Sequence, residues 1–178
     1  MNRQNIVLIG MPGCGKSTVG RHVSSQTGLQ FVDLDRYIED RSGQTIPQLF
    51  EQGESVFRAQ ETTACQDFSE PCGCVIATGG GVVLKEENMR LLKSGGRIIF
   101  LDRDLDHILS DIECSTRPLL KKGKQAVEDL YRERITLYRK YADLIIPNNA
   151  TLSDCIEKVI QEVSRIVAMS FCEPRSWV

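Results

Sequence analysis

Residues 10–17 read Gly-Met-Pro-Gly-Cys-Gly-Lys-Ser, and they directly follow the apolar run Ile-Val-Leu-Ile at residues 6–9. The stretch fits the pattern Gly-x4-Gly-Lys-Ser/Thr without a departure, and a helical pattern begins at its lysine. Such glycines let the backbone fold around a phosphate group with N–H groups pointing inward, and the start of the helix adds a favourable dipole. A chance glycine-rich turn explains neither the strand before the motif nor the helix after it. The stretch therefore predicts the phosphate-binding loop of a nucleotide site.

The same loop indicates roles for individual residues. Lys16 is long enough to reach the β- and γ-phosphates of ATP, and the Ser17 hydroxyl is a ligand that Mg²⁺ accepts. We therefore expect ATP as the nucleotide, Mg²⁺ as the cofactor and Lys16 as a catalytic residue. The residues expected to contact the nucleotide are Gly13, Cys14, Gly15, Lys16, Ser17 and Thr18.

Strand and helix patterns alternate along the whole chain. Short apolar runs predict strands over residues 6–9, 31–33, 74–77, 97–101 and 144–146. Helical patterns cover residues 16–27, 35–42, 47–52, 54–69, 86–93, 104–112, 124–141 and 152–169, with Gly28 as the C-cap of the first. This alternation predicts right-handed βαβ units, and hence an α/β fold with one parallel sheet wrapped by helices.

Length and composition fit one globular domain over residues 1–178. The 178 residues carry a net charge of −2 and are 41% hydrophobic, so neither a nucleic acid nor a membrane surface is an expected partner. The first apolar run is too short for a signal peptide or a membrane span, and we expect a cytoplasmic protein. Seven cysteines lie scattered without a metal-binding spacing, which disfavours a zinc site or a disulfide framework.

Two segments interrupt the alternation. Residues 113–124 are polar and rich in turn-forming residues, as functional or disordered loops commonly are, and they contain Arg117. A cation on a mobile loop over the phosphates would neutralise charge on the transferring group and exclude water. The last residues, 170–178, lack a helical pattern and are expected to form a loose tail.

A pair of carboxylates follows the second predicted strand. Residues two apart on an extended backbone face the same side, so Asp33 and Asp35 are expected to project from the carboxyl edge of the sheet, where ligands of such sheets bind. One could hold Mg²⁺ while the other accepts a hydroxyl group. The alternative for Asp35 is a simple helix N-cap, a role that Asp33 could fill as well. Arg58 is a further candidate, because its planar guanidinium suits a carboxylate.

Three consecutive glycines, Gly79, Gly80 and Gly81, follow the third strand. A plain turn needs fewer glycines, and we expect this run to let the main chain approach a ligand. Arg139 lies near the end of the predicted helix over residues 124–141. Taken alone, it is better explained as a cation favoured by the helix dipole.

Taken together, these motifs resemble the shikimate kinase family over about residues 5–165. The motifs that carry the resemblance are Gly15-Lys16-Ser17, Asp33-Leu-Asp35, Phe57-Arg58 with Glu61, Gly79-Gly80-Gly81, Arg117-Pro-Leu-Leu and Arg134-x-x-Leu-Tyr138-x-x-x-Ala142-Asp143. The resemblance implies a three-layer α/β/α sandwich with strand order 2-3-1-4-5, as in nucleoside monophosphate kinases. It also implies a mobile lid over residues 113–124 and a monomer.

The resemblance further implies an activity in aromatic amino acid biosynthesis, the transfer of the ATP γ-phosphoryl group to the 3-hydroxyl of shikimate. Asp35 would hold the acceptor hydroxyl, and Asp33 would order the metal's ligands. Arg58 and Arg139 would bind the shikimate carboxylate, Gly79, Gly80 and Gly81 would line the acceptor's site, and Arg117 would act as a catalytic and nucleotide-binding residue. Arg58 and Arg139 are each weak candidates when taken alone, and the resemblance implies that they act together on one carboxylate.

Two departures from the family pattern concern the adenine contacts. No arginine or lysine lies between Arg103 and Arg117, and the segment after the fifth strand reads Pro-Asn-Asn-Ala-Thr at 147–151, without the frequent arginine. A GTPase switch would need a guanine-reading Asn-Lys-x-Asp run, and the sequence contains none; Asn148-Asn149 is the nearest approach. The alternatives left open are a related kinase acting on gluconate or a nucleoside monophosphate, and a nucleotide-responsive binding module without catalysis.

Overall fold

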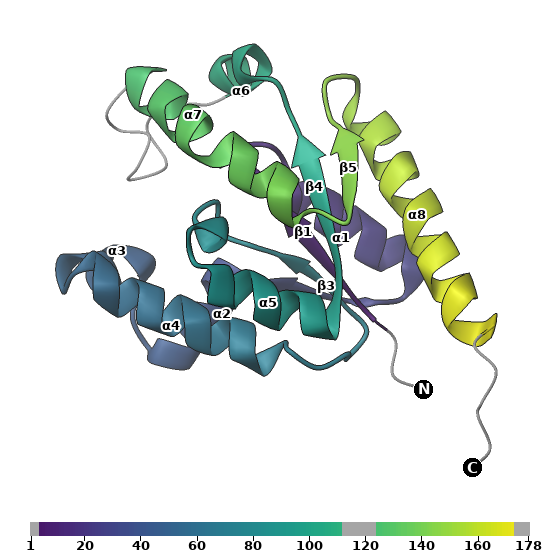
Figure 1. Ribbon diagram of the computed structural model, residues 1–178, viewed down its shortest axis with the longest axis horizontal. Coiled ribbons are helices and arrows are strands. Elements are labelled where there is room, and N and C mark those ends of the chain that lie inside the picture. Colours follow the sequence, from purple (N-terminus) through teal and green to yellow (C-terminus); the bar gives the residue numbers. More distant parts are fainter. Residues whose placement is uncertain (1–3, 112–123, 173–178) are drawn as a thin grey trace.

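The computed structural model describes residues 4–111 and 124–172, and five of its strands form one sheet in the order β2-β3-β1-β4-β5 (Figure 1). All four pairings are parallel. The predicted α/β class and strand order are therefore confirmed. The strands are β1 (Asn5–Ile9), β2 (Gln30–Asp33), β3 (Cys74–Ala77), β4 (Gly96–Asp102) and β5 (Leu144–Pro147).

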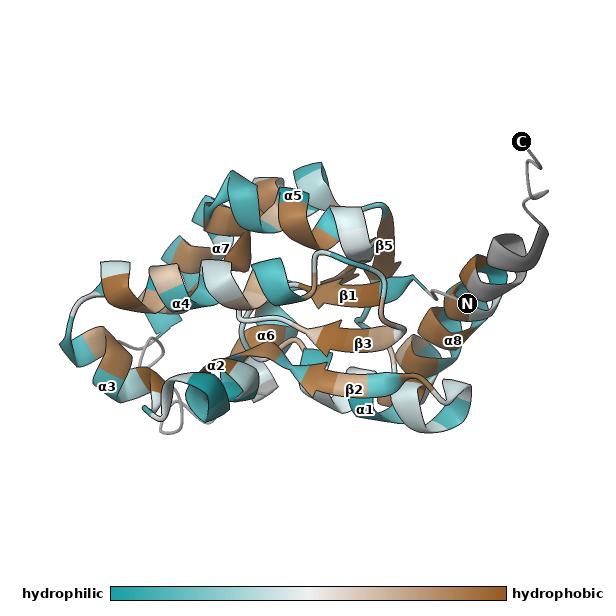
Figure 2. Cartoon of the chain, turned by 90° about the horizontal axis from the view of Figure 1, so that it is seen from below, coloured by the Kyte–Doolittle hydropathy of each residue, from teal (hydrophilic) through white to brown (hydrophobic). Residues whose placement is uncertain are grey.

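Helices cover both faces of the sheet and complete a three-layer sandwich. Figure 2 shows α4, α5 and α7 on one side of the strands, and α1 and α8 on the other. None of the described helices combines the length and apolar character that a bilayer span requires. The helices are α1 (Lys16–Thr27), α2 (Leu34–Ser42), α3 (Ile46–Glu51), α4 (Glu54–Asp67), the short 3₁₀ helix η1 (Val82–Leu84), α5 (Glu86–Gly95), α6 (Leu105–Asp111), α7 (Lys124–Tyr141) and α8 (Leu152–Cys172).

Residues at the helix ends account for several of these boundaries. Helix α1 has the predicted bounds, and Gly28 ends it in the left-handed region, at φ 70°, with its N–H bonded to the Ser24 carbonyl. Helix α3 begins with a capping box between Thr45 and Gln48. Helix α8 continues to Cys172, three residues beyond its predicted end, so the predicted tail begins too early.

The central strands supply the core of the sheet. Every residue of β1 and β3 is buried, because helices pack on both faces and a strand lies on either side. Strand β2 is only half buried, since it lies at an edge of the sheet. The apolar runs that predicted the strands therefore reflect the position of each strand in the sheet.

Asn5 is a buried polar residue at the start of β1. Its Nδ2 donates to the carbonyls of Phe68 and Glu70 at 3.3 and 3.0 Å. Its Oδ1 accepts from the N–H groups of Cys72 and Cys74 at 3.0 and 3.1 Å. One side chain thus satisfies four backbone groups between α4 and β3, and it fixes the segment that leads into β3.

Replacing Asn5 should therefore destabilise the protein. We expect Asn5→Ala to lower the free energy of unfolding by about 3 kcal/mol, because it removes four hydrogen bonds to the backbone and leaves buried backbone groups unpaired. Denaturant titration measures the difference. The matched control is the exposed neighbour Gln4, whose replacement by alanine should change stability by less than about 0.5 kcal/mol. Equal effects of the two substitutions would contradict the role of Asn5.

Candidate active site

The phosphate-binding loop connects β1 to α1 at the carboxyl edge of the sheet. Gly10, Gly13 and Gly15 adopt φ values of 147°, 86° and 89°, a region in which glycine carries no steric cost. The loop opens onto a cleft of about 230 Å³. The cleft is lined by Gly13, Gly15, Lys16, Ser17, Thr18, Asp33, Asp35 and Thr78. The loop and both predicted aspartates therefore share one cavity.

Lys16 is buried within its own loop. Its side chain donates to the carbonyls of Gly10 and Met11 at 2.8 and 2.9 Å, and only 7% of the residue is exposed. Neutral carbonyls compensate a buried ammonium only in part. A phosphate group in the cleft is therefore a better partner for Lys16 than the contacts that it makes here.

Ser17 and Asp33 form a pair of oxygen atoms in the cleft. The Ser17 hydroxyl donates to Asp33 Oδ2 at 2.7 Å, and Asp33 Oδ1 accepts from the Arg36 N–H at 3.4 Å. Asp33 is therefore the N-cap of α2 as well as a partner of Ser17. A hydroxyl and a carboxylate beside a phosphate-binding loop are hard oxygen ligands of the kind that Mg²⁺ uses.

The structure corrects the expected placement of Asp35. The residue lies in the first turn of α2 and neither continues the strand nor caps the helix. It still lines the cleft with Asp33, because the helix begins directly at the end of β2. The two aspartates therefore lie in one cleft, but the extended backbone predicted for Asp35 was wrong.

The glycine triplet packs closely against Asp35, which lines the cleft, and against Pro12 and Arg58. A Cβ atom on Gly79 would lie 2.7 Å from Asp35 Oδ1, and one on Gly80 would lie 2.7 Å from the Pro12 ring. A Cβ atom on Gly81 would lie 2.5 Å from Arg58 Nη1. None of the three glycines has a positive φ. Close approach, not backbone freedom, therefore explains the triplet.

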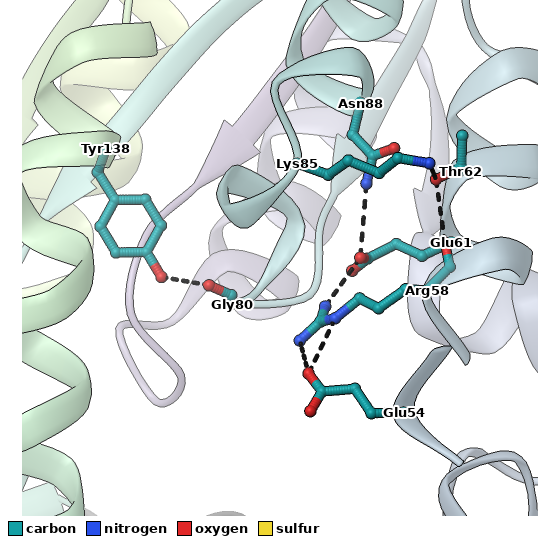
Figure 3. A network of polar contacts seen from close by, with 8 residues as sticks. All are labelled: Glu54, Arg58, Glu61, Thr62, Gly80, Lys85, Asn88 and Tyr138. Atoms are coloured by element: carbon teal, nitrogen blue, oxygen red, sulfur yellow. Dashed lines mark hydrogen bonds and ion pairs between the residues drawn. The ribbon is translucent and has the colours of Figure 1, made fainter. Parts of the chain in front are cut away.

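Arg58 lies between two glutamates of its own helix (Figure 3). Its guanidinium donates to Glu54 Oε1 at 3.2 and 3.1 Å and to Glu61 Oε2 at 2.8 Å. Burial lowers the pKa of Arg58, but the two carboxylates outweigh it and raise the pKa overall. The arginine therefore remains charged, and its two partners fix its position beside Gly81.

Glu61 is the buried member of this group. Only 1% of the residue is exposed, and Oε1 has no hydrogen-bond partner among the described residues. Burial raises the pKa of Glu61, while the Arg58 charge and hydrogen bond oppose the shift. The charge of Asp35 raises this pKa further, and that of Arg134 lowers it. Asp35, Arg58 and Arg134 are therefore all close enough to Glu61 to affect its ionisation.

Arg134 and Tyr138 approach the same region from α7. The Tyr138 hydroxyl donates to the Gly80 carbonyl across a short contact (Figure 3). Burial raises the pKa of the Tyr138 phenol, and the charge of Arg134 opposes the shift. Arg134 is only 4% exposed, and its Nη1 finds no hydrogen-bond partner in the part of the chain that the structure describes. A buried guanidinium with a vacant donor is a candidate ligand for an anion.

The structure does not bring Arg139 to the cleft. Its side chain is 55% exposed and pairs with Asp102 at 3.3 Å. Five residues along a helix turn a side chain by about 140°, so Arg139 faces away from Arg134, whereas Tyr138 shares the face of Arg134. Arg117 and the predicted lid as far as residue 123 lie outside the described residues. Arg134, which the resemblance included only as part of a motif, lies instead on the buried face of α7 with Tyr138, where its charge affects Glu61.

Known proteins were compared with the chain at the levels of sequence and structure. The shikimate kinase family model matches residues 12–165. A shikimate kinase of Clostridium botulinum (strain Alaska E43 / Type E3) is 47% identical over 93% of this chain and 98% of its own length. The structure of "Shikimate kinase from Acinetobacter baumannii in complex with shikimate" superposes with a TM-score of 0.83 at 32% identity and covers 96% of both chains. A gluconokinase from Sinorhizobium meliloti 1021 reaches a TM-score of 0.61 at 13% identity, covering 96% of this chain and 97% of its own, which shows the fold alone. The chain belongs to the shikimate kinase family.

Proposed function

We propose that this protein transfers the γ-phosphoryl group of ATP to the 3-hydroxyl of shikimate and so forms shikimate 3-phosphate and ADP. The family assignment supports the reaction, and one feature of the structure supports the placement of the reactants. The phosphate-binding loop and Asp35 line the same cleft, and the glycine triplet connects Asp35 to Arg58. A phosphate cradle therefore faces a carboxylate that is suited to an acceptor hydroxyl.

The donor side of the cleft would hold the phosphates of ATP. The N–H groups of the loop and the Lys16 ammonium would stabilise the charge on the β- and γ-phosphates. Ser17 and Asp33 would hold Mg²⁺, which when bound neutralises charge on the transferring group. Arg117 remains a predicted nucleotide contact, supported by its place in the family motif alone.

The acceptor side would bind shikimate through charge complementarity. Asp35 would accept a hydrogen bond from the 3-hydroxyl and take up its proton as the bond to phosphorus forms. Arg58 and Arg134 would bind the carboxylate, since both guanidinium groups lie close to Glu61 and Arg134 retains a vacant donor. Gly79, Gly80 and Gly81 would line the ring, since a Cβ atom on them would collide with Asp35, Pro12 or Arg58 and only glycine leaves this space open.

A comparison of acceptors tests the proposed reaction. We expect shikimate to stimulate ADP release from Mg-ATP strongly, and gluconate and AMP to have no comparable effect. A coupled assay of ADP formation, analysed as kcat/KM for each acceptor, gives the comparison. If gluconate or AMP were the preferred acceptor, the assignment of shikimate would be wrong. Tight ATP binding without turnover of any acceptor would support a binding module without catalysis.

Asp35 provides a test of the catalytic carboxylate. We expect Asp35→Asn to lower kcat by about 10²- to 10⁴-fold, because the amide cannot take up the hydroxyl proton. ATP affinity should stay close to that of the wild type, since the side chain serves the acceptor. Asp40→Asn is the matched control, because Asp40 lies on the same helix with a side chain that is 74% exposed. A near-normal kcat for Asp35→Asn would remove Asp35 from this role.

Arg134 and Arg139, which lie on different faces of α7, provide a test of the acceptor contacts. We expect Arg134→Ala and Arg134→Lys to raise the KM for shikimate by about 10- to 100-fold, which is the range for losing a hydrogen bond between charged groups. Arg139→Ala should leave it nearly unchanged, because Arg139 pairs with Asp102 on another face of the helix. The KM for ATP is the internal control. A large rise in the KM for shikimate in Arg139→Ala, with little change in the Arg134 variants, would show that Arg139 binds the acceptor instead.

A further inference from the structure

Asn148 occupies a fixed place directly after β5. Its N–H donates to the Asp102 carbonyl at 2.8 Å, which extends the pairing of β5 with β4 by one residue. Its carbonyl accepts from Arg103 Nη1 at 2.7 Å. The residue is only 4% exposed. The backbone of Asn148 is therefore held on both sides by the end of β4, and its side chain has little freedom.

The side chain of Asn148 connects this corner of the sheet to the phosphate-binding loop. Nδ2 donates to the carbonyl of Cys14 at 2.8 Å, and the contact is buried. A carbonyl oxygen only accepts hydrogen bonds, so the amide nitrogen of Asn148 must face it. A Cβ atom on Gly15 would lie 3.8 Å from the same nitrogen. Asn148 thus lies directly behind the peptide group that joins Cys14 to Gly15.

This contact determines the direction of one N–H group of the loop. The peptide between Cys14 and Gly15 is trans and planar, so its carbonyl and its N–H point in opposite directions. Asn148 holds the carbonyl on the side away from the cleft, and the Gly15 N–H is therefore aimed toward the cleft that Gly15 lines. We propose that Asn148 is a positioning residue for nucleotide phosphates, acting through the orientation of the Cys14–Gly15 peptide.

The hydrogen bond from Asn148 supplements those that the loop makes internally. Gly15 adopts φ 89° and has no side chain to oppose a rotation of the preceding peptide. Lys16 holds the carbonyls of Gly10 and Met11 here, but under the proposed function its ammonium turns to the phosphates. The hydrogen bond from Asn148 remains available in both situations. It keeps one N–H donor in place without reorganisation when the nucleotide binds.

The inference rests on the proposed function only in taking the loop's ligand to be a nucleotide. The segment after β5 lacks the arginine that the family pattern frequently places there as an adenine contact. The structure instead shows that the segment reaches the phosphate-binding loop. Asn149 beside it has a separate role, since its Oδ1 accepts from the Asp104 N–H at 2.8 Å at the start of α6. Neighbouring asparagines therefore offer a matched pair for an experiment.

Two variants of Asn148 test the proposal. Asn148→Ala removes the donor without adding charge, and Asn148→Asp keeps the size but has no N–H group. Each should weaken ADP binding by about three- to tenfold, the effect of one hydrogen bond, and raise the KM for ATP to a similar extent. The inhibition constant of adenosine, which carries no phosphate, and the KM for shikimate should not change. Calorimetry with ADP and steady-state kinetics supply these values, and Asn149→Ala should bind ADP like the wild type.

The outcomes separate positioning from general damage. Unchanged ADP affinity in both Asn148 variants, with cooperative unfolding retained, would overturn the proposal. So would an equal weakening of ADP and adenosine, because a disturbed site lacks the dependence on phosphate. Failure of the proposed function looks different: the wild type would bind ADP, but shikimate would not stimulate ADP release. The ADP comparison between Asn148 and Asn149 variants remains valid in that case.

Discussion

The pairing of β1 with β3 is the constraint on which the rest of the site depends. Leu8 pairs with Ala77 in parallel register, and the N–H and hydroxyl of Thr78 both donate to the Leu8 carbonyl. The two glycine-rich segments therefore leave the sheet side by side, although about seventy residues separate them along the chain. The contact between the Pro12 ring and Gly80 follows from this arrangement. The phosphate-binding loop and the glycine triplet thus share one scaffold, and hydrogen bonds between β1 and the end of β3 hold them together.

The charges beside this scaffold are balanced in pairs. A buried carboxylate such as Glu61 costs free energy unless a cation and hydrogen bonds compensate it, and Arg58 supplies both. Arg58 makes three hydrogen bonds to its glutamates, whereas a guanidinium carries five N–H donors. The glutamates therefore orient the arginine without using all of its capacity. Under the proposed function, an anionic acceptor would therefore bind to Arg58 without displacing Glu61.

The sequence predicted the parts of the protein that depend on local chemistry. Apolar runs predicted the strands, and Gly28 was correctly predicted as the C-cap of α1. The motif that ends at Lys16 and Ser17 predicted the phosphate-binding loop. Arg139 was assigned to the acceptor site through the family resemblance, and its position near a helix end did not show which side of the helix it faces. The buried residues Val127, Arg134 and Tyr138 do share one face of α7, so tracing the helical period from Tyr138 would have identified Arg134. No local pattern could have identified Asn148, because its partner Cys14 lies 134 residues away.

The arrangement also explains how a chain with a net charge of −2 could attract anions. Lys16 and Arg134 are buried cations, with 7% and 4% of each residue exposed. Folding has already removed most of their water, while carbonyls satisfy Lys16 only in part and Arg134 Nη1 has no partner among the described residues. The free energy of desolvation is therefore spent before a ligand arrives. An anion that binds there would supply the hydrogen bonds and the negative charge that Lys16 and Arg134 lack in the folded protein. Local positive charge would therefore favour anion binding, although the net charge of the whole protein does not.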